Sequence, residues 1–548
     1  MNLRVRTLLP SRADYAGLAR SWRGDLVAGV TVGIVALPLA LGFGVSAGLS
    51  AEAGLVTAVV AGVLAAVFGG SHVQVSGPTG AMVVVLVPIV ATRGPGAVVV
   101  VTLLAGILVM LAGVLRLGRA VSFIPWPVIE GFTLGIAVII FAQQIPALVS
   151  PHVAGASEHS SNAIVAAVQA VTDLDPAYAA WALGAVGIVV VCMWGAPRLH
   201  RGVPGSLVGI VVVAVAALVI GAPLARIGAL PGTLPAPALP AIDLSSLTAL
   251  AAPAATVAAL AAIESLLSAR VAASLGDTGT YDPDRELVGQ GLASIGSSLF
   301  GGMPATGAIA RTAVNVRSGA RSRLAAVTHA VVLLLVVIAA AGPVGQIPLA
   351  ALAGVLMVTA VRMVHVDTVR AILRSTRADA VAFVATAVIT VSFDLIVAVV
   401  IGVAFAGFFV LRGMSQASQV RREDVRGHTQ PGDERIAILR FDGPLSFTSA
   451  DRVSAEVDAI RDVSVVIMRM SQLELVDATG AHMLGELTQA LERRGITVLI
   501  KGVQPRHEEL FRSVGVLAAL RHHNHLFADL PSAIAHARTH VQRETATA

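Results

Sequence analysis

Long apolar stretches occupy most of this chain. They start near Gly29 and continue to about Leu411, and turns that contain glycine or proline divide them into about fourteen segments. A helix needs roughly 20 apolar residues to cross a bilayer, and several of these segments reach that length. The pattern therefore predicts an α-helical polytopic membrane protein of about fourteen spans.

The pattern changes abruptly near Leu411, where charged and mixed sequence begins. Short apolar runs there alternate with amphipathic segments, which predicts a small α/β domain with a parallel sheet. The expected strands are Ile436–Phe441, Val465–Met468 and Ile496–Ile500, and the expected helices are about Ser449–Ile460 and Gly480–Arg493. We therefore divide the chain into an N-terminal segment (1–25), a transmembrane domain (26–412), a linker (413–432) and this α/β domain (433–548).

Composition supports the membrane assignment. The 548 residues are 56% hydrophobic and 13% charged, with a formal net charge of +5. The basic residues are scattered and almost all arginine, so we expect no nucleic-acid partner. Arginines cluster before the first span, up to Arg23, and after the last, at Arg412 and Arg421. The positive-inside rule then places both ends in the cytoplasm. We expect a multi-pass protein of a bacterial inner membrane, with the lipid bilayer as its partner.

Cysteine and histidine give no sign of a metal or cofactor. Cys192 is the single cysteine and lies in an apolar segment, which excludes a disulfide framework and a thiolate metal site. The segment Arg521–His525 contains three histidines, but no carboxylate or cysteine stands beside them at ligand spacing. We therefore expect a solvated loop there, no metal and no cofactor.

Two short segments far apart in the chain share an unusual pattern. Phe68-Gly69-Gly70 precedes Pro78-Thr79-Gly80-Ala81, and Phe300-Gly301-Gly302 precedes Ala305-Thr306-Gly307-Ala308. The apolar run after each threonine reaches only about 20 Å as a helix, so both helices should begin near the membrane midplane. Paired interruptions of this kind indicate a transporter binding site, and their positive helix ends favour an anion. Chance recurrence in a chain rich in alanine, valine and glycine is the alternative.

Two ionisable residues fall beside these interruptions. Glu264 lies deep in an apolar helix with Ser268 four residues later on the same face, and Arg311 lies five residues after Thr306. Each is costly to bury alone, so we predict that Glu264 and Arg311 lie close enough to influence one another. Arg311 would hold the anion, while Glu264 would balance its charge or load a proton with the anion. The alternative is a permanent ion pair that only joins two helices.

The chain resembles the SulP family of anion transporters, also called solute carrier family 26. The resemblance rests on motifs spread along the chain: Val35–Ala40, Ser76–Gly80, Glu286–Ala293, Phe300–Gly302 and Ala308–Ala320. It implies a transporter and not an enzyme, with fourteen spans in two inverted seven-span repeats, core and gate domains, elevator-like motion and a homodimer.

The resemblance also assigns site residues. The family binds its anion between the starts of spans 3 and 10, which correspond here to Thr79, Gly80, Gly307 and Ala308. Span 1 closes the site, which suggests Phe43. Arg311 matches the span-10 arginine near the anion in animal relatives, and Glu264 matches the span-8 carboxylate implicated in cation coupling.

Coupling residues differ from those of one branch of the family. In its cyanobacterial sodium-dependent bicarbonate transporters the positions of Glu264, Ser268 and Ile309 are aspartate, threonine and threonine. Ile309 removes an oxygen that sodium would need, so we expect a proton as the coupling ion. The anion stays open among a C4-dicarboxylate, sulfate and bicarbonate. Sodium-dependent bicarbonate transport, an uncoupled channel or exchanger, and a membrane signalling scaffold remain alternatives.

The α/β domain contains Val476-Asp477-Ala478-Thr479-Gly480, which resembles the STAS domain shared by anti-sigma-factor antagonists and anion transporters. In the antagonists this loop carries a phosphorylated serine, and Thr479 falls at that position. Thr479 is thus a possible phosphosite, and the domain would have a cytoplasmic partner that the sequence does not identify. The alternative is that Asp477 caps the helix and Thr479 only supports the turn.

Overall fold

The structure is a computed structural model of the 548-residue chain, and it separates into two compact units, 1–403 and 404–548. It describes residues 8–547, apart from 16–17, 120–124, 150–161, 200–203, 241–246, 276–278, 393–400, 402–403, 406, 410, 412–418, 426–429, 447–452, 454–455, 458–459 and 461.

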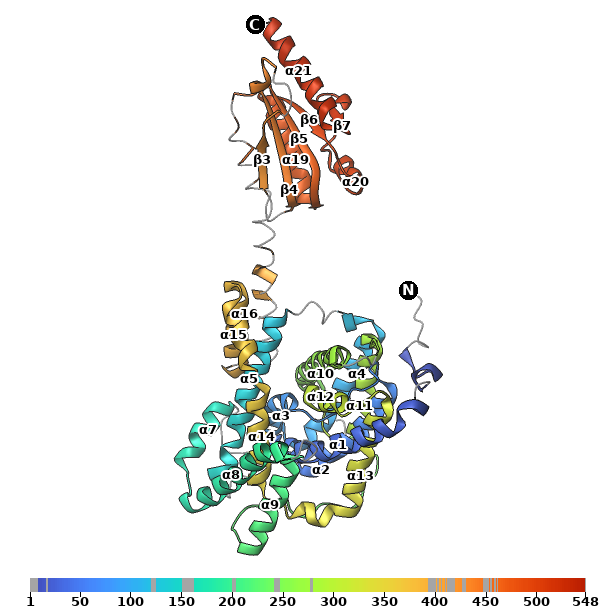
Figure 1. The fold of residues 1–548 in the computed structure, drawn as a ribbon, viewed down its shortest axis with the longest axis vertical. Helices are drawn as coiled ribbons and strands as arrows, with labels where there is room; N and C mark the ends of the chain where they lie inside the picture. Colours follow the sequence, from blue (N-terminus) through green and yellow to red (C-terminus); the bar gives the residue numbers. More distant parts are fainter. Residues whose placement is uncertain are drawn as a thin grey trace. The chain divides into compact units, whose positions relative to one another are not determined.

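Helices of the first unit form two groups (Figure 1). One group comprises α1 (Leu18–Ser46), α2 (Ala51–Phe68), α3 (Gly80–Arg93), α4 (Pro95–Val114), α10 (Leu247–Leu275), α11 (Pro283–Leu299), α12 (Ile309–Arg317) and α13 (Arg323–Gly345). The other comprises α5 (Trp126–Gln144), α6 (Pro146–Val149), α7 (Ala163–Thr172), α8 (Pro176–Leu199), α9 (Gly205–Ile220), α14 (Leu349–Met363), α15 (Val366–Arg374) and α16 (Arg377–Ser392). We call these the core group and the gate group.

Many of these helices are long enough to cross a bilayer. Eight helical stretches of the described residues are long and apolar enough to cross a bilayer, and α3 and α9 are shorter apolar helices. Large apolar side chains face outward on them, such as Val191 at 70% and Val219 at 80% exposure. Because water would penalise such a surface, it confirms the predicted polytopic helical membrane fold. Most of residues 393–411, where the last predicted span falls, lie outside the described residues.

The N-terminal segment is tied to the core group. Asp14 of the 3₁₀ helix η2 (Arg12–Tyr15) lies 2.8 Å from the Arg285 guanidinium and 3.7 Å from that of Arg323. These arginines begin or nearly begin α11 and α13, and Arg323 also donates to the Ala66 carbonyl at 2.8 Å. The contacts fix three helix ends of the core group to one another.

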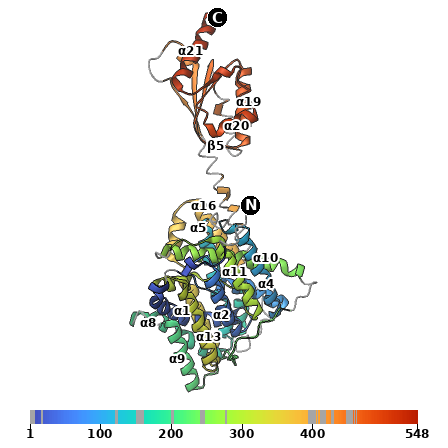
Figure 2. The same cartoon turned by 90° about the vertical axis from the view of Figure 1, so that its right-hand side faces the viewer.

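The second unit is a five-stranded sheet in the order β3-β4-β5-β6-β7. Its strands are β3 (Gln419–Glu423), β4 (Ile436–Leu445), β5 (Val465–Val476), β6 (Thr497–Lys501) and β7 (Leu526–Phe527), and β4 to β7 are parallel. Alternating apolar residues pack α19 (Ala478–Arg493) and α20 (Pro505–Val514) on one face, and α21 (Leu530–Thr547) on the other (Figure 2). Asp433 anchors α21 through Arg538 at 2.8 and 2.9 Å, and this guanidinium holds the pKa of the Asp433 carboxyl below its usual range.

The predicted α/β domain is confirmed, with one detail to correct. The predicted linker from Gly413 to Gly432 is too long, because Gln419–Glu423 form β3 and pair antiparallel with β4. The polar, charged sequence of β3 gave no strand signal, since the strand lies at the edge of the sheet and is largely exposed. Most of the predicted helix Ser449–Ile460 lies outside the described residues.

Candidate functional site

Both interrupted segments fold as predicted into short helices, each preceded by an extended segment. Ser76–Gly77 (β1) pairs antiparallel with Thr306–Gly307 (β2), so Ser76 lies opposite Gly307. Immediately after these strands, α3 and α12 begin, with Thr79 and Ala308 as their N-caps. The pairing satisfies backbone groups that would otherwise be unpaired inside the membrane. It also brings two positive helix ends to the same place.

Glu264 joins the starts of the two helices. Its Oε2 atom accepts hydrogen bonds from the hydroxyls of Thr79 at 2.7 Å and Thr306 at 2.8 Å. The two hydroxyls are 3.2 Å apart. Thr79 is 8% exposed and Thr306 fully buried, so the carboxylate sits in a largely enclosed polar cluster. One ionisable group of α10 therefore contacts both halves of the site at once.

Arg311 reaches across from α12 to the start of α3. Its Nη2 donates a short hydrogen bond to the Pro78 carbonyl, next to Thr79. The side chain is 2% exposed, and Nη1 is buried without a hydrogen-bond partner among the described residues. A buried donor of a charged group is costly to leave unpaired, so Nη1 is available to an incoming acceptor.

Glu264 and Arg311 interact electrostatically but not as a contact pair. Each contributes to the electrostatic environment of the other. The ion pairs found in the described part of the chain do not include one between them. The carboxylate is bound by threonines and the guanidinium by a carbonyl. This arrangement disfavours the permanent ion pair that was the alternative interpretation.

Gly307 and Ala308 lie at the predicted place, but their amides are already used. The Gly307 N–H donates to Ser265 Oγ at 3.1 Å, and the Ala308 N–H donates to the Val75 carbonyl at 2.9 Å. The first four N–H groups of a helix have no partner within it, so the donors that remain at this end belong to Ile309, Ala310 and Arg311. Ile309 is 39% exposed. Gly307 and Ala308 shape the start of α12, and its first turn presents the donors.

The Ser268 hydroxyl is hydrogen-bonded to a residue of α12. Its hydroxyl lies 3.1 Å from that of Thr312 on α12, which also accepts the Val75 N–H at 3.0 Å. Ser268 shares a helix face with Glu264, but its hydrogen bond connects α10 to α12 one turn beyond the threonine cluster. The predicted role of Ser268 in cation coupling stays a prediction.

Phe43 borders the start of α3. The side chain is 6% exposed, and a methyl group added at Gly80 would lie 3.4 Å from its ring and 2.2 Å from Ile140 Cδ1. Phe43 comes from α1 of the core group and Ile140 from α5 of the gate group. Side chains from both groups thus pack directly against the start of α3 at Gly80.

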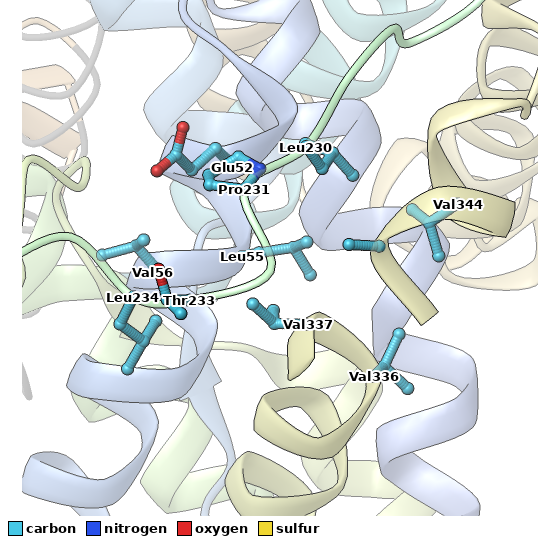
Figure 3. Close-up of a pocket in the computed structure, with 11 residues that line it drawn as sticks. Glu52, Leu55, Val56, Leu230, Pro231, Thr233, Leu234, Val336, Val337 and Val344 are labelled. Carbon is cyan, nitrogen blue, oxygen red and sulfur yellow. The ribbon is translucent and has the colours of Figure 1, made fainter. Parts of the chain in front are cut away.

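An apolar pocket elsewhere in the unit does not suit an anion. It lies between α2, residues 230–234 and α13 (Figure 3). Among the described residues that line it, Glu52 is the one with a charge, and the others are mainly valine and leucine. A carboxylate without a cation repels an anion, so the paired starts of α3 and α12 are the better site.

The glycine just before α12 allows a direct prediction. A Cβ at Gly307 would lie 1.7 Å from Gln74 Nε2 and 3.1 Å from Ser268 Cβ. Gln74 is buried and donates to the Ser265 carbonyl, so it cannot move without losing that bond. We expect Gly307→Ala to abolish uptake and to lower the thermal stability of the purified protein. Gly301→Ala is the control for a glycine with open space around it, although its positive φ adds local strain. Wild-type uptake by Gly307→Ala would contradict the packing described here.

Comparison with known proteins identifies the transmembrane part. The sulfate permease family profile matches residues 22–386. The chain belongs to the sulfate permease family. As a member it is a multi-pass membrane transporter of anions and not an enzyme. The SulP resemblance is therefore confirmed, and residues 429–533 match the STAS domain.

Relatives and solved structures agree with this membership. YvdB of Bacillus subtilis, a candidate sulfate transporter by its name, is 34% identical over 505 residues, which cover 91% of this chain and 94% of YvdB. The bicarbonate transporter BicA of Picosynechococcus is 31% identical over 506 residues, covering 86% and 88%. The overall structure of SLC26A9 superposes with a TM-score of 0.83 at 16% identity, covering 98% of this chain and 94% of that one, and shows the fold.

In the STAS domain, Asp477 caps α19. Its Oδ1 accepts the Gly480 N–H at 2.7 Å, while Thr479 is exposed in the first turn. The cap accounts for Asp477 in structural terms. Exposure leaves the Thr479 hydroxyl accessible, so the phosphosite stays a prediction.

Proposed function

We propose that this transporter takes up a small inorganic oxyanion, bicarbonate or sulfate, together with a proton that binds Glu264. The anion would lie between the starts of α3 and α12, in contact with the Arg311 guanidinium. The observation that supports this most directly is the contact of Glu264 with both Thr79 and Thr306.

Coupling follows from the charge of this cluster. When Glu264 is ionised, both threonine hydroxyls donate to it, and its charge offsets that of Arg311. When Glu264 is protonated, the negative charge beside the site disappears and the hydroxyls can turn to another acceptor. An anion then meets Arg311 and two positive helix ends without a competing carboxylate. Proton and anion each favour the binding of the other, which is the condition for symport.

Close packing at the start of α3 and the names of the relatives favour a compact anion over a C4-dicarboxylate. Ile140 and Phe43 pack against Gly80, which leaves little room for a long ligand beside this helix end. The relatives named above are a bicarbonate transporter and a candidate sulfate transporter by name. We expect the core group to carry the anion past the gate group in an elevator-like motion, in a homodimer with both termini in the cytoplasm.

Sodium is the second candidate for the coupling ion. The Glu264 carboxylate and the hydroxyls of Thr79 and Thr306 place three oxygens together, which is a start of a sodium site. Ile309 and Ser268 add no further oxygen to it, because Ile309 is apolar and Ser268 is directed to Thr312. Proton coupling is therefore better supported.

Uptake by the full chain in proteoliposomes tests the proposal. We expect radiolabelled bicarbonate or sulfate to accumulate inside when the outside is more acidic. We expect a sodium gradient to have no effect on this accumulation. Competition with sulfate, bicarbonate, succinate and fumarate identifies the anion. Accumulation driven only by sodium would assign sodium coupling, and equilibration without accumulation would indicate a channel or exchanger. Absence of transport for all four anions would favour a signalling scaffold.

A further inference from the structure

The second unit contains a cluster of imidazoles that the transport site does not involve. His525 precedes β7, and His536 and His540 lie one turn apart on α21. Their rings stand 4.9 to 5.5 Å apart between centroids. The sequence pattern predicted a solvated loop around His525, and that prediction is wrong for this residue, which is only 2% exposed. The packing of α21 on the sheet encloses it.

The nitrogen atoms of the cluster are arranged like metal ligands. One ring nitrogen from each histidine lies within 4.8 Å of the others. The Nε2 atoms of His536 and His540 are 3.2 Å apart. In a tetrahedral zinc site with Zn–N bonds of about 2.0 to 2.1 Å, ligand nitrogens are about 3.3 Å apart. Two of the three ligands therefore already have the required separation.

His525 supplies an independent observation. Its Nδ1 is buried and has no hydrogen-bond partner among the described residues. The ring also has a hydrogen bond with the Val498 backbone on β6. When a histidine binds a metal through one ring nitrogen, a hydrogen bond from its other ring nitrogen fixes the orientation of the ring. An unpaired buried nitrogen, in a ring that packs against two other imidazoles, is explained if a cation binds between the rings.

We propose that His525, His536 and His540 bind one divalent transition-metal ion of the zinc class. Imidazole nitrogens suit zinc, nickel and copper, and an i, i+4 pair on a helix is a common way to present two of them. Arg521 and Arg543 act electrostatically on the site and oppose a cation, while the Glu544 carboxylate favours it. Bound metal would fasten α21 to the β6–β7 edge of the sheet, independently of the transport mechanism.

Metal binding by the full-length, tag-free protein in detergent tests this proposal. We expect one equivalent of Zn²⁺ per chain by titration calorimetry, and Co²⁺ to give the intense visible absorption of a tetrahedral nitrogen site. His536→Gln and His540→Gln should each weaken Zn²⁺ at least about 10-fold. His482→Gln is the matched control, because His482 is an exposed helical histidine of the same unit and lies outside the cluster.

A thermal melt separates metal binding from misfolding. At the same concentration, Zn²⁺ should raise the melting temperature of the wild type and of His482→Gln, and raise that of His536→Gln clearly less. Failure of the wild type to bind a stoichiometric metal would overturn the proposal. So would zinc binding that survives both His536→Gln and His540→Gln. If the variants do not fold, the Co²⁺ spectrum of the wild type decides alone.

Discussion

Glu264→Gln is expected to abolish proton-driven accumulation of the anion while leaving anion exchange intact. Glutamine has the same shape, and its amide oxygen can still accept the hydroxyls of Thr79 and Thr306. It cannot gain or lose a proton, so the site would stay in its anion-binding form. With one proton per anion, a gradient of one pH unit drives about 10-fold accumulation, because one unit corresponds to about 1.4 kcal/mol. The variant should accumulate nothing above equilibrium.

The measurement compares net uptake with exchange in the same proteoliposomes. Glu52→Gln is the matched control, since Glu52 is a carboxylate of α2 that lines the apolar pocket and not the starts of α3 and α12. It should accumulate the anion as the wild type does. Full proton-driven accumulation by Glu264→Gln would remove Glu264 from the coupling mechanism. Loss of both uptake and exchange, with unchanged thermal stability, would assign Glu264 to anion binding instead.

The location of the candidate site at the starts of α3 and α12 was predictable, because it depends on short local sequence patterns. Glycine and proline interrupt apolar runs at Thr79 and Thr306, and bilayer thickness then fixes where the short helices begin. A buried charge such as Glu264 or Arg311 is conspicuous in apolar sequence for the same energetic reason. Position along the chain therefore revealed the two helix starts and the ionisable residues.

The partners of these residues were not predictable, because they depend on how helices rotate against one another. Sequence spacing places Ser268 and Glu264 on one face of α10, but it does not show that Glu264 meets Thr306 while Ser268 meets Thr312. Thr306 was visible as the counterpart of Thr79 in the repeated pattern, and that equivalence was the available signal for its role. Ser265, whose hydroxyl accepts a hydrogen bond from the Gly307 N–H, had no feature in the sequence that indicated this role.

The same limit applies to the second unit. The histidines at 522–525 and those on α21 are separated in sequence, and only the packing of α21 across the sheet brings His525 to His536 and His540. The spacing of apolar residues predicted most strands and helices, because burial of one face imposes a regular apolar pattern on each of them. None of the residues of the edge strand β3 is fully buried, so β3 lacks the alternating apolar pattern of the other strands. Its charged sequence therefore resembled a linker.

Arg311→Gln is expected to raise the KM for the anion about 10- to 100-fold while preserving the dependence on the pH gradient. A hydrogen bond to a charged group contributes about 1.5 to 3 kcal/mol, and each 1.4 kcal/mol changes an equilibrium about tenfold. Arg311→Lys should fall between this variant and the wild type. Lysine keeps the charge but has no planar fork to hold the Pro78 carbonyl and an anion together.

Arg317→Gln is the control for this prediction, because Arg317 ends the same helix and is exposed. It should leave the KM unchanged, whereas a general effect of lost positive charge would appear in both variants. Initial uptake rates over a range of anion concentrations, at a fixed pH gradient, give the KM for each protein. An unchanged KM in Arg311→Gln would mean that Nη1 does not meet the anion. A lowered melting temperature with an unchanged KM would then assign Arg311 to holding the start of α3, and the helix ends alone would bind the anion.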